Sequence, residues 1–187
     1  MDAFEQVVAE ILWMEGYWVR TSVKIELTKD EKRTIGRPSS PRWELDIVAY
    51  NGRDNLLRVV ECKSYLDSLG VQAQGFDPES KNAARYKLFN DDVLRETVFA
   101  RLAMQFTAAG LCRTSPDVKL CLACGKINEK GRQAIRMLFN RNRWELWDET
   151  WLRQRLELMA EGGYENQTSA VVAKLLLRGA LSKNSPP

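Results

Sequence analysis

Two apolar runs joined by a short polar turn constrain this chain more than any other feature. The runs cover residues 43–48 and 56–63, and the Asn-Gly pair between them is a strong hairpin signal. Charged residues interrupt these runs at Asp46, Glu61 and Lys63. Side chains two apart on a strand share a face, so Glu61 and Lys63 project together while the residue between them points away. We therefore expect a hairpin that gathers two carboxylates and one ammonium group in a small volume.

The paired carboxylates indicate a cation site. Two like charges held close together resist ionising at once unless a cation lies between them, and Mg²⁺ is the usual oxygen-loving ion in such sites. This is the apparatus of metal-assisted phosphodiester cleavage. The alternative for Glu61 and Lys63 is an ordinary salt bridge near a sheet edge. We favour the metal site, because charged residues placed after an apolar run are costly without a purpose.

The composition removes several other chemistries. The 187 residues include no histidine, which excludes a Ser-His-Asp triad, a Cys-His nucleophile pair, a His-ligated metal and a His general base. The net charge of +3 does not by itself require a nucleic-acid partner. Hydrolysis must then rely on carboxylates, lysine and a metal ion.

The cysteines and the apolar runs bear on location. The four cysteines fit a reducing compartment better than a disulfide framework. The pair Cys121-Leu122-Ala123-Cys124 has metal-ligand spacing, but it lies in an apolar strand-like run and is interpreted as buried structural thiols. No apolar run reaches the length of a bilayer span, and the start of the chain lacks an export signal. We expect a cytoplasmic protein with no membrane association.

Periodicity predicts an α/β fold in which a mixed central sheet is flanked by helices. The expected elements are a helix over 2–15, a strand over 17–27, a loop over 29–41, hairpin strands over 42–50 and 56–65, an irregular insertion over 66–87, a helix over 90–109, a strand over 118–125, a basic helix over 128–140, a strand over 144–147, and helices over 149–161 and 168–178. Residues 1–160 are expected to form the core domain, and 161–187 a C-terminal helix followed by a disordered tail.

The order of these elements, with Asp46 and Glu61-Cys62-Lys63, resembles the PD-(D/E)XK nuclease superfamily, which has the restriction endonuclease-like fold. Leu45 stands where the motif name has proline. A narrower resemblance is to the Mrr-like restriction endonucleases, carried by residues 59–65 and by the sequence Gly-Val-Gln at 70–72. Glu61 stands where those proteins often carry glutamine. The resemblance covers roughly residues 2–160.

The resemblance implies roles for individual residues. Asp46 and Glu61, with the backbone carbonyl of Cys62, would hold Mg²⁺ or Mn²⁺. Lys63 would orient or deprotonate the attacking water and offset charge at the phosphorus. Glu5 on the first helix is the candidate for the additional glutamate that many members carry. Its alternative is a solvated helix residue, and the two are nearly even.

Three further residues are noted near this predicted site. Glu44 shares a strand face with Asp46 and is a reserve ligand. Tyr65 and Gln72 follow the hairpin and could approach a substrate.

Two basic segments are candidates for phosphate contacts. Their residues are Arg33, Arg37 and Arg42 on the early loop and Lys130, Arg132 and Arg136 on the basic helix. A salt-bridged or solvated surface is the competing interpretation of both segments.

Three functions remain open at this stage. The first is a Mg²⁺-dependent DNA endonuclease of restriction or defence type. The second is a junction-resolving or repair nuclease, because the early glutamate and the small size also resemble Holliday-junction resolvases. The third is a non-catalytic DNA-binding subunit that keeps the nuclease fold. A homodimer is an alternative to a monomer, since cutting both strands of a duplex calls for two sites.

Overall fold

The computed structural model describes residues 2–39, 42–163 and 165–181, and within these residues five strands form a single mixed sheet. The strands are β1 (Trp18–Ile25), β2 (Trp43–Asn51), β3 (Leu56–Lys63), β4 (Asp117–Cys124) and β5 (Glu145–Trp147). The same residues form seven α-helices, α1 (Ala3–Met14), α2 (Lys29–Thr34), α3 (Lys87–Asn90), α4 (Asp92–Ala108), α5 (Arg132–Asn142), α6 (Glu149–Glu161) and α7 (Thr168–Leu181), and the short 3₁₀ turns η1 (Ala73–Phe76), η2 (Ala83–Arg85) and η3 (Glu129–Gly131).

The sheet order follows the chain order from β1 to β5. An antiparallel meander of β1, β2 and β3 continues into the parallel strands β4 and β5. Parallel neighbours need crossover connections, and helices α4 and α5 lie within the two crossovers. The carboxyl ends of β3, β4 and β5 therefore meet at one edge of the sheet, which also receives the start of β2. We call this edge the C-terminal edge.

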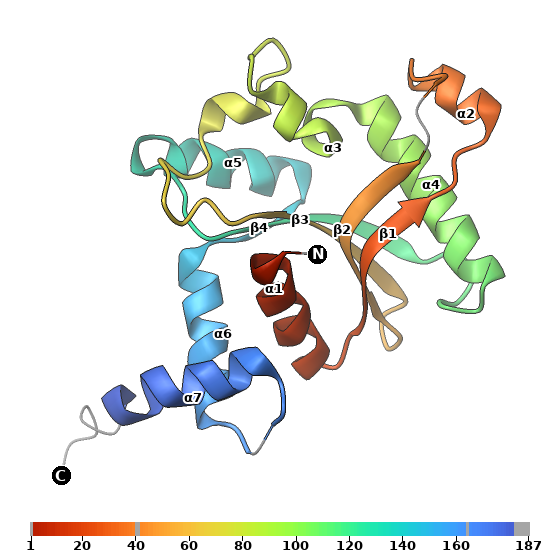
Figure 1. Ribbon diagram of the computed structural model, residues 1–187. Coiled ribbons are helices and arrows are strands. Elements are labelled where there is room, and N and C mark those ends of the chain that lie inside the picture. The colour runs from red at the N-terminus through yellow and green to blue at the C-terminus, as the bar shows by residue number, and fades with distance from the viewer. Residues whose placement is uncertain (1, 40–41, 164, 182–187) are drawn as a thin grey trace.

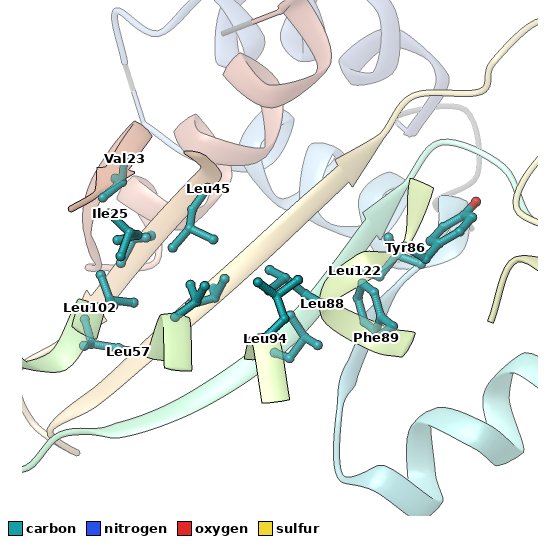
Figure 2. Packing of buried hydrophobic residues seen from close by; sticks show 14 of the residues in the cluster. Val23, Ile25, Leu45, Leu57, Tyr86, Leu88, Phe89, Leu94, Leu102 and Leu122 are labelled. Atoms are coloured by element: carbon teal, nitrogen blue, oxygen red, sulfur yellow. The ribbon is translucent and has the colours of Figure 1, made fainter. Parts of the chain in front are cut away.

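Helices cover both faces of the sheet (Figure 1). The first core lies between the sheet and helices α3, α4 and α5, and the second lies between the sheet and helices α1, α6 and α7. Strand β4 contributes to both, because Leu120 and Leu122 enter the first core and Cys121 and Ala123 enter the second. Figure 2 shows part of the first core, where Leu122 packs near Tyr86, Leu88 and Phe89.

Most elements expected from periodicity are present, and the α/β fold class with a mixed sheet is confirmed. The hairpin strands, the long helix after 90 and the strand after 118 each lie within a few residues of their expected bounds. Segment 66–87 is irregular, as expected, apart from the two turns η1 and η2. Helix α7 packs through Ala170 and Ala173 into the second core, and the expected tail at 182–187 lies outside the described residues.

The loop expected over 29–41 is wrong in its first half, where the structure has helix α2. Thr28 caps this helix by accepting from the Glu31 backbone N–H at 3.2 Å, and the Glu31 carboxylate accepts from the Thr28 N–H at 2.7 Å. This reciprocal capping box follows the sequence signature Thr-x-x-Glu, which sequence analysis overlooked because the segment has no apolar periodicity. Residues 40 and 41 lie outside the described part.

Cys121 and Cys124 are buried thiols, as expected. All four are free thiols, and Cys62, Cys121 and Cys124 are buried. Burial raises the pKa of each of these three thiols, which keeps them protonated and unreactive at neutral pH. Among the described residues, no helix combines the length and apolar character that crossing a membrane requires.

An aromatic group centred on Phe139 fastens α5 to the first core. The Phe139 ring lies 5.3 Å from the rings of Phe76 and Phe89 and 5.6 Å from Trp144, and its side chain is buried. We expect Phe139→Ala to lower the free energy of unfolding by about 3–5 kcal/mol, because it leaves a cavity among these rings. Met137→Ala on the exposed side of the same helix is the matched control and should change it by about 0.5 kcal/mol or less. Urea denaturation measures both, and equal effects would refute this packing account.

Candidate active site

Strand β2 is irregular at Asp46. Leu45 packs in the first core and Ile47 in the second, although residues two apart on a regular strand share a face. On the neighbouring strand, Ser22 has a positive φ of 51°, and the pairing of β1 with β2 skips Ser22 and Asp46. The backbone therefore turns at this position, and Asp46 takes no part in the ladder with β1.

The Asp46 carboxylate bridges a fork between two strands. Pairing of β2 with β3 ends at Ile47 and Val60, whereas β3 continues beside β4 as far as Lys63. In the fork, Asp46 Oδ2 accepts a hydrogen bond from the Cys62 backbone N–H at 2.8 Å. This hydrogen bond takes the place of the backbone pairing that β2 and β3 lack here. It holds the Asp46 carboxylate at Cys62, the residue between Glu61 and Lys63 in the sequence.

Glu61 and Lys63 lie on the same face of β3, as the sequence predicts. Their charged groups are 3.7 Å apart, and their side chains are only 15% and 20% exposed, respectively. The Cys62 side chain points into the second core on the other face. The structure thus brings Asp46, Glu61 and Lys63 together at the C-terminal edge of the sheet.

The environment of Glu61 opposes its ionisation. Burial is the main cause that raises the pKa of Glu61, the negative charge of Asp46 raises it further, and Lys63 only partly offsets them, giving a value of about 7. A carboxyl with this pKa is half protonated near neutral pH. A bound cation would stabilise its ionised form.

Glu5 approaches the same group from α1, but it also has a structural role. Its carboxylate accepts from the Asp2 N–H at 3.2 Å, and Asp2 accepts from the Glu5 N–H at 2.8 Å, which makes a capping box. Burial and the charge of Asp46 raise the pKa of Glu5. The sequence signature Asp-x-x-Glu would have shown the capping role, and the coupling to Asp46 places Glu5 beside the candidate site.

The donor set fits a magnesium ion that is completed by substrate. Among the described residues, no group of three or more His, Cys, Asp or Glu side chains is arranged to hold a metal ion. The available protein donors are Asp46, Glu61 and the Cys62 carbonyl. Mg²⁺ in phosphate-processing sites is commonly held by one or two carboxylates, with substrate phosphates and water as the other ligands. Glu44, the reserve ligand, is exposed on β2.

Of the three arginines near α2, Arg33 and Arg42 are exposed and Arg37 is partly buried. Arg33 pairs with Asp30 at 3.0 Å within the helix, and Arg42 pairs with Glu26 at 3.2 Å. The Arg37 guanidinium lies 5.2 Å from the centre of the Trp43 ring. Exposed pairs of this kind contribute little to stability, so these side chains could exchange their partners for phosphates.

The basic residues around α5 divide into two kinds. Arg132 is largely buried and contacts the carboxylates of Glu129, Asp148 and Glu149. Its guanidinium lies 2.6 Å from the Glu129 carboxylate. These contacts raise its pKa and favour the salt-bridge interpretation for this residue. Arg136 is half exposed and bonds to Asp148 at 2.8 Å.

Lys130 differs from Arg132 and Arg136, which both pair with carboxylates. It is exposed, and its ammonium group has no partner among the residues that the structure describes. Of the three residues predicted on the basic helix, Lys130 is therefore the best placed to contact phosphate.

Asn82 and Arg85 lie near the end of β3 and are not among the residues predicted from the sequence. Tyr65 and Gln72, noted as neighbours of the predicted site, line a cavity of about 170 Å³ together with Asn82 and Arg85. Asn82 and Arg85 lie in the segment that has no periodic pattern, and only the fold brings them next to the end of β3.

Comparisons with known proteins found no matching family model, no similar curated protein and no similar solved structure.

The raised pKa of Glu61 predicts how stability depends on pH in the absence of metal. Folding raises this pKa from its ordinary value of 4.5, so the contribution of Glu61 to stability is present below about pH 4.5 and is lost as the pH rises through 7. We expect Glu61→Gln to increase the free energy of unfolding at pH 8 by about 1–3 kcal/mol, with a smaller gain at pH 5.

Urea denaturation in EDTA at the two pH values measures this effect. Glu44→Gln, at an exposed carboxylate on the neighbouring strand, is the control and should show neither gain. A destabilised Glu61→Gln variant at pH 8 would contradict the electrostatic account of the site.

Proposed function

We propose that this protein is a Mg²⁺-dependent nuclease that hydrolyses phosphodiester bonds in DNA. One observation carries the proposal: the Asp46 carboxylate spans the fork between β2 and β3 to the Cys62 N–H, close enough to the paired Glu61 and Lys63 to raise the pKa of Glu61. This arrangement places two carboxylates, a peptide carbonyl and an ammonium group at an edge of the sheet. These are the groups that metal-assisted phosphoryl hydrolysis requires.

The fold supports the same proposal. Helix α1, the meander β1–β3, helix α4 and strand β4 follow the order of the restriction endonuclease-like core that the sequence resemblance implies. The Asp and Glu-x-Lys elements occupy the second and third strands of that meander. Fold similarity of this kind raises the expectation of nuclease chemistry, but the site residues have to provide it.

Asp46, Glu61 and the Cys62 carbonyl would hold the metal ion. When bound, Mg²⁺ supplies a Lewis acid for the scissile phosphate and acidifies a water ligand. The hydrogen bond from the Cys62 N–H orients the Asp46 carboxylate before any ion arrives. The raised pKa of Glu61 means that metal binding near neutral pH displaces a proton from the site.

Lys63 acts on the reacting atoms through its ammonium group. Its Nζ lies 3.7 Å from the Glu61 carboxylate at the C-terminal edge, and its side chain is partly exposed. From there it donates hydrogen bonds to the attacking water or to a phosphate oxygen, and it offsets the negative charge that develops at phosphorus. Only a residue with both reach and positive charge can fill this role.

Loss of Lys63 or Asp46 should abolish catalysis and leave the fold intact. We expect Lys63→Ala and Asp46→Ala each to reduce Mg²⁺-dependent cleavage of supercoiled DNA by at least about 100-fold. Agarose-gel assays with and without Mg²⁺ measure the rate, and circular dichroism checks the fold. Lys24→Ala, at an exposed lysine on β1, is the control. Full activity of Lys63→Ala would refute the assignment, and a wild-type protein that binds DNA without cleaving it would favour the non-catalytic subunit.

The two kinds of basic residue should respond differently to substitution. We expect Lys130→Ala to weaken binding to DNA of any sequence and to reduce the slope of log affinity against log salt by about one. Arg132→Ala should instead lower the free energy of unfolding by roughly 1–3 kcal/mol, since it removes the ion-pair partner of Glu149 and leaves Asp148 with Arg136 alone among its two arginines. Fluorescence anisotropy and urea denaturation measure the two effects. An unchanged salt dependence in Lys130→Ala would remove this residue from the DNA interface.

A further inference from the structure

A small cavity is lined by residues that follow the candidate catalytic lysine in the sequence. Its volume is about 170 Å³, and its lining includes Tyr65, Gln72 and Tyr86. Tyr65 follows Lys63 by two residues, so their Cα atoms are separated by no more than about 7.6 Å. This separation is roughly two steps of a stacked nucleotide strand, each about 3.4 Å. A nucleotide next to a phosphate held by Lys63 would therefore be within reach of Tyr65 in the cavity wall.

The walls of the cavity are held firmly. Gly75 lies flat against the Tyr86 ring, and a Cβ atom at this position would be only 2.4 Å from the ring. The side-chain amide of Asn90 donates to the carbonyls of Gly75, at 2.8 Å, and Ala83, at 3.3 Å, which ties turn η1 to turn η2. Tyr86 is buried at the end of the first core, with its hydroxyl directed away from the leucines (Figure 2). The cavity is thus formed before any ligand binds.

Three polar side chains around the cavity have no partner within the described part of the protein. Gln72 and Asn82 are half buried and Arg85 is exposed, and their side chains make no hydrogen bond or ion pair with any described residue. A half-buried amide lowers the stability of the fold unless water or a ligand completes its hydrogen bonds. Amide and guanidinium groups are also the side chains that read the edges of nucleobases. The lining therefore offers donors and acceptors that an incoming base can use.

The volume of the cavity is close to that needed for a single six-membered ring. A cavity of about 150 Å³ accommodates benzene, so about 170 Å³ suits a single six-membered ring. We propose that this cavity receives one unstacked pyrimidine base next to the scissile phosphate, so that the preferred substrate is DNA with unpaired nucleotides. This inference rests on the proposed nuclease function and specifies its substrate class. A base that is paired within a duplex cannot enter such a pocket without being flipped out of the stack.

Binding measurements in EDTA separate the cavity from the chemistry. The probes are fluorescently labelled single-stranded (dT)₂₀, single-stranded (dA)₂₀ and the blunt duplex that they form together. We expect the wild-type protein to bind (dT)₂₀ at least tenfold more tightly than the duplex, and more tightly than (dA)₂₀.

The variants test which residues produce this preference. The double variant Gln72→Ala/Asn82→Ala should weaken binding to (dT)₂₀ by 5- to 30-fold and change duplex binding by less than twofold. Arg85→Ala, which removes an exposed side chain, should also weaken (dT)₂₀ binding. Gln74→Ala is the matched control, because Gln74 is an exposed glutamine two residues from Gln72 and outside the cavity lining. Equal binding to single strand and duplex, or variants that leave (dT)₂₀ binding unchanged, would overturn the proposal.

A parallel cleavage assay with Mg²⁺ distinguishes failure of this inference from failure of the nuclease function. If the wild-type protein cleaves no DNA while the cavity variants still lose (dT)₂₀ binding selectively, the nuclease function fails and the base pocket stands. If the protein cleaves blunt duplex in a manner that needs Asp46 and Lys63, and the cavity variants bind and cleave every probe normally, the pocket fails and the nuclease stands.

Discussion

The hydrogen bond from the Cys62 N–H to the Asp46 carboxylate is the interaction on which the site depends. Strands β2 and β3 separate just before it, so a backbone donor at the end of β3 would otherwise lack a partner. Using a charged side chain in place of a backbone carbonyl keeps the strand end ordered. It also brings a second negative charge beside Glu61. A bound cation would offset the repulsion between these two carboxylates.

The sequence predicted the elements whose hydrophobic residues follow a regular period. Alternation and 3.6-residue periodicity located the sheet and the longer helices, and the two-residue spacing placed Glu61 and Lys63 on one face. It could not predict the break at Asp46, because that break depends on a positive φ at Ser22 on a different strand. The capping boxes at Asp2 and Thr28 follow the local signatures Asp-x-x-Glu and Thr-x-x-Glu, which apolar periodicity does not reveal.

Long-range contacts account for the remainder. From the sequence, the basic residues near α5 are predicted to form one phosphate-binding surface. In the structure Arg132 is instead held in ion pairs, because Asp148 and Glu149 follow β5 and contact it at the C-terminal edge. The cavity lined by Tyr65 and Gln72 likewise includes residues from a segment with no periodic pattern. Side chains of this kind become neighbours only when the crossover helices α4 and α5 fix the sheet order, and no local pattern encodes that contact.

Direct titration of Mn²⁺ into the metal-free protein tests the central claim most simply. Calorimetry near pH 7 should show one ion bound per chain with release of protons, because Glu61 is partly protonated there before the ion binds. Asp46→Asn, which keeps the shape of the side chain and removes its charge, should lose most of this affinity. Equal binding by the wild-type protein and Asp46→Asn, or no binding by either, would contradict the account of this site as a metal-dependent catalytic centre.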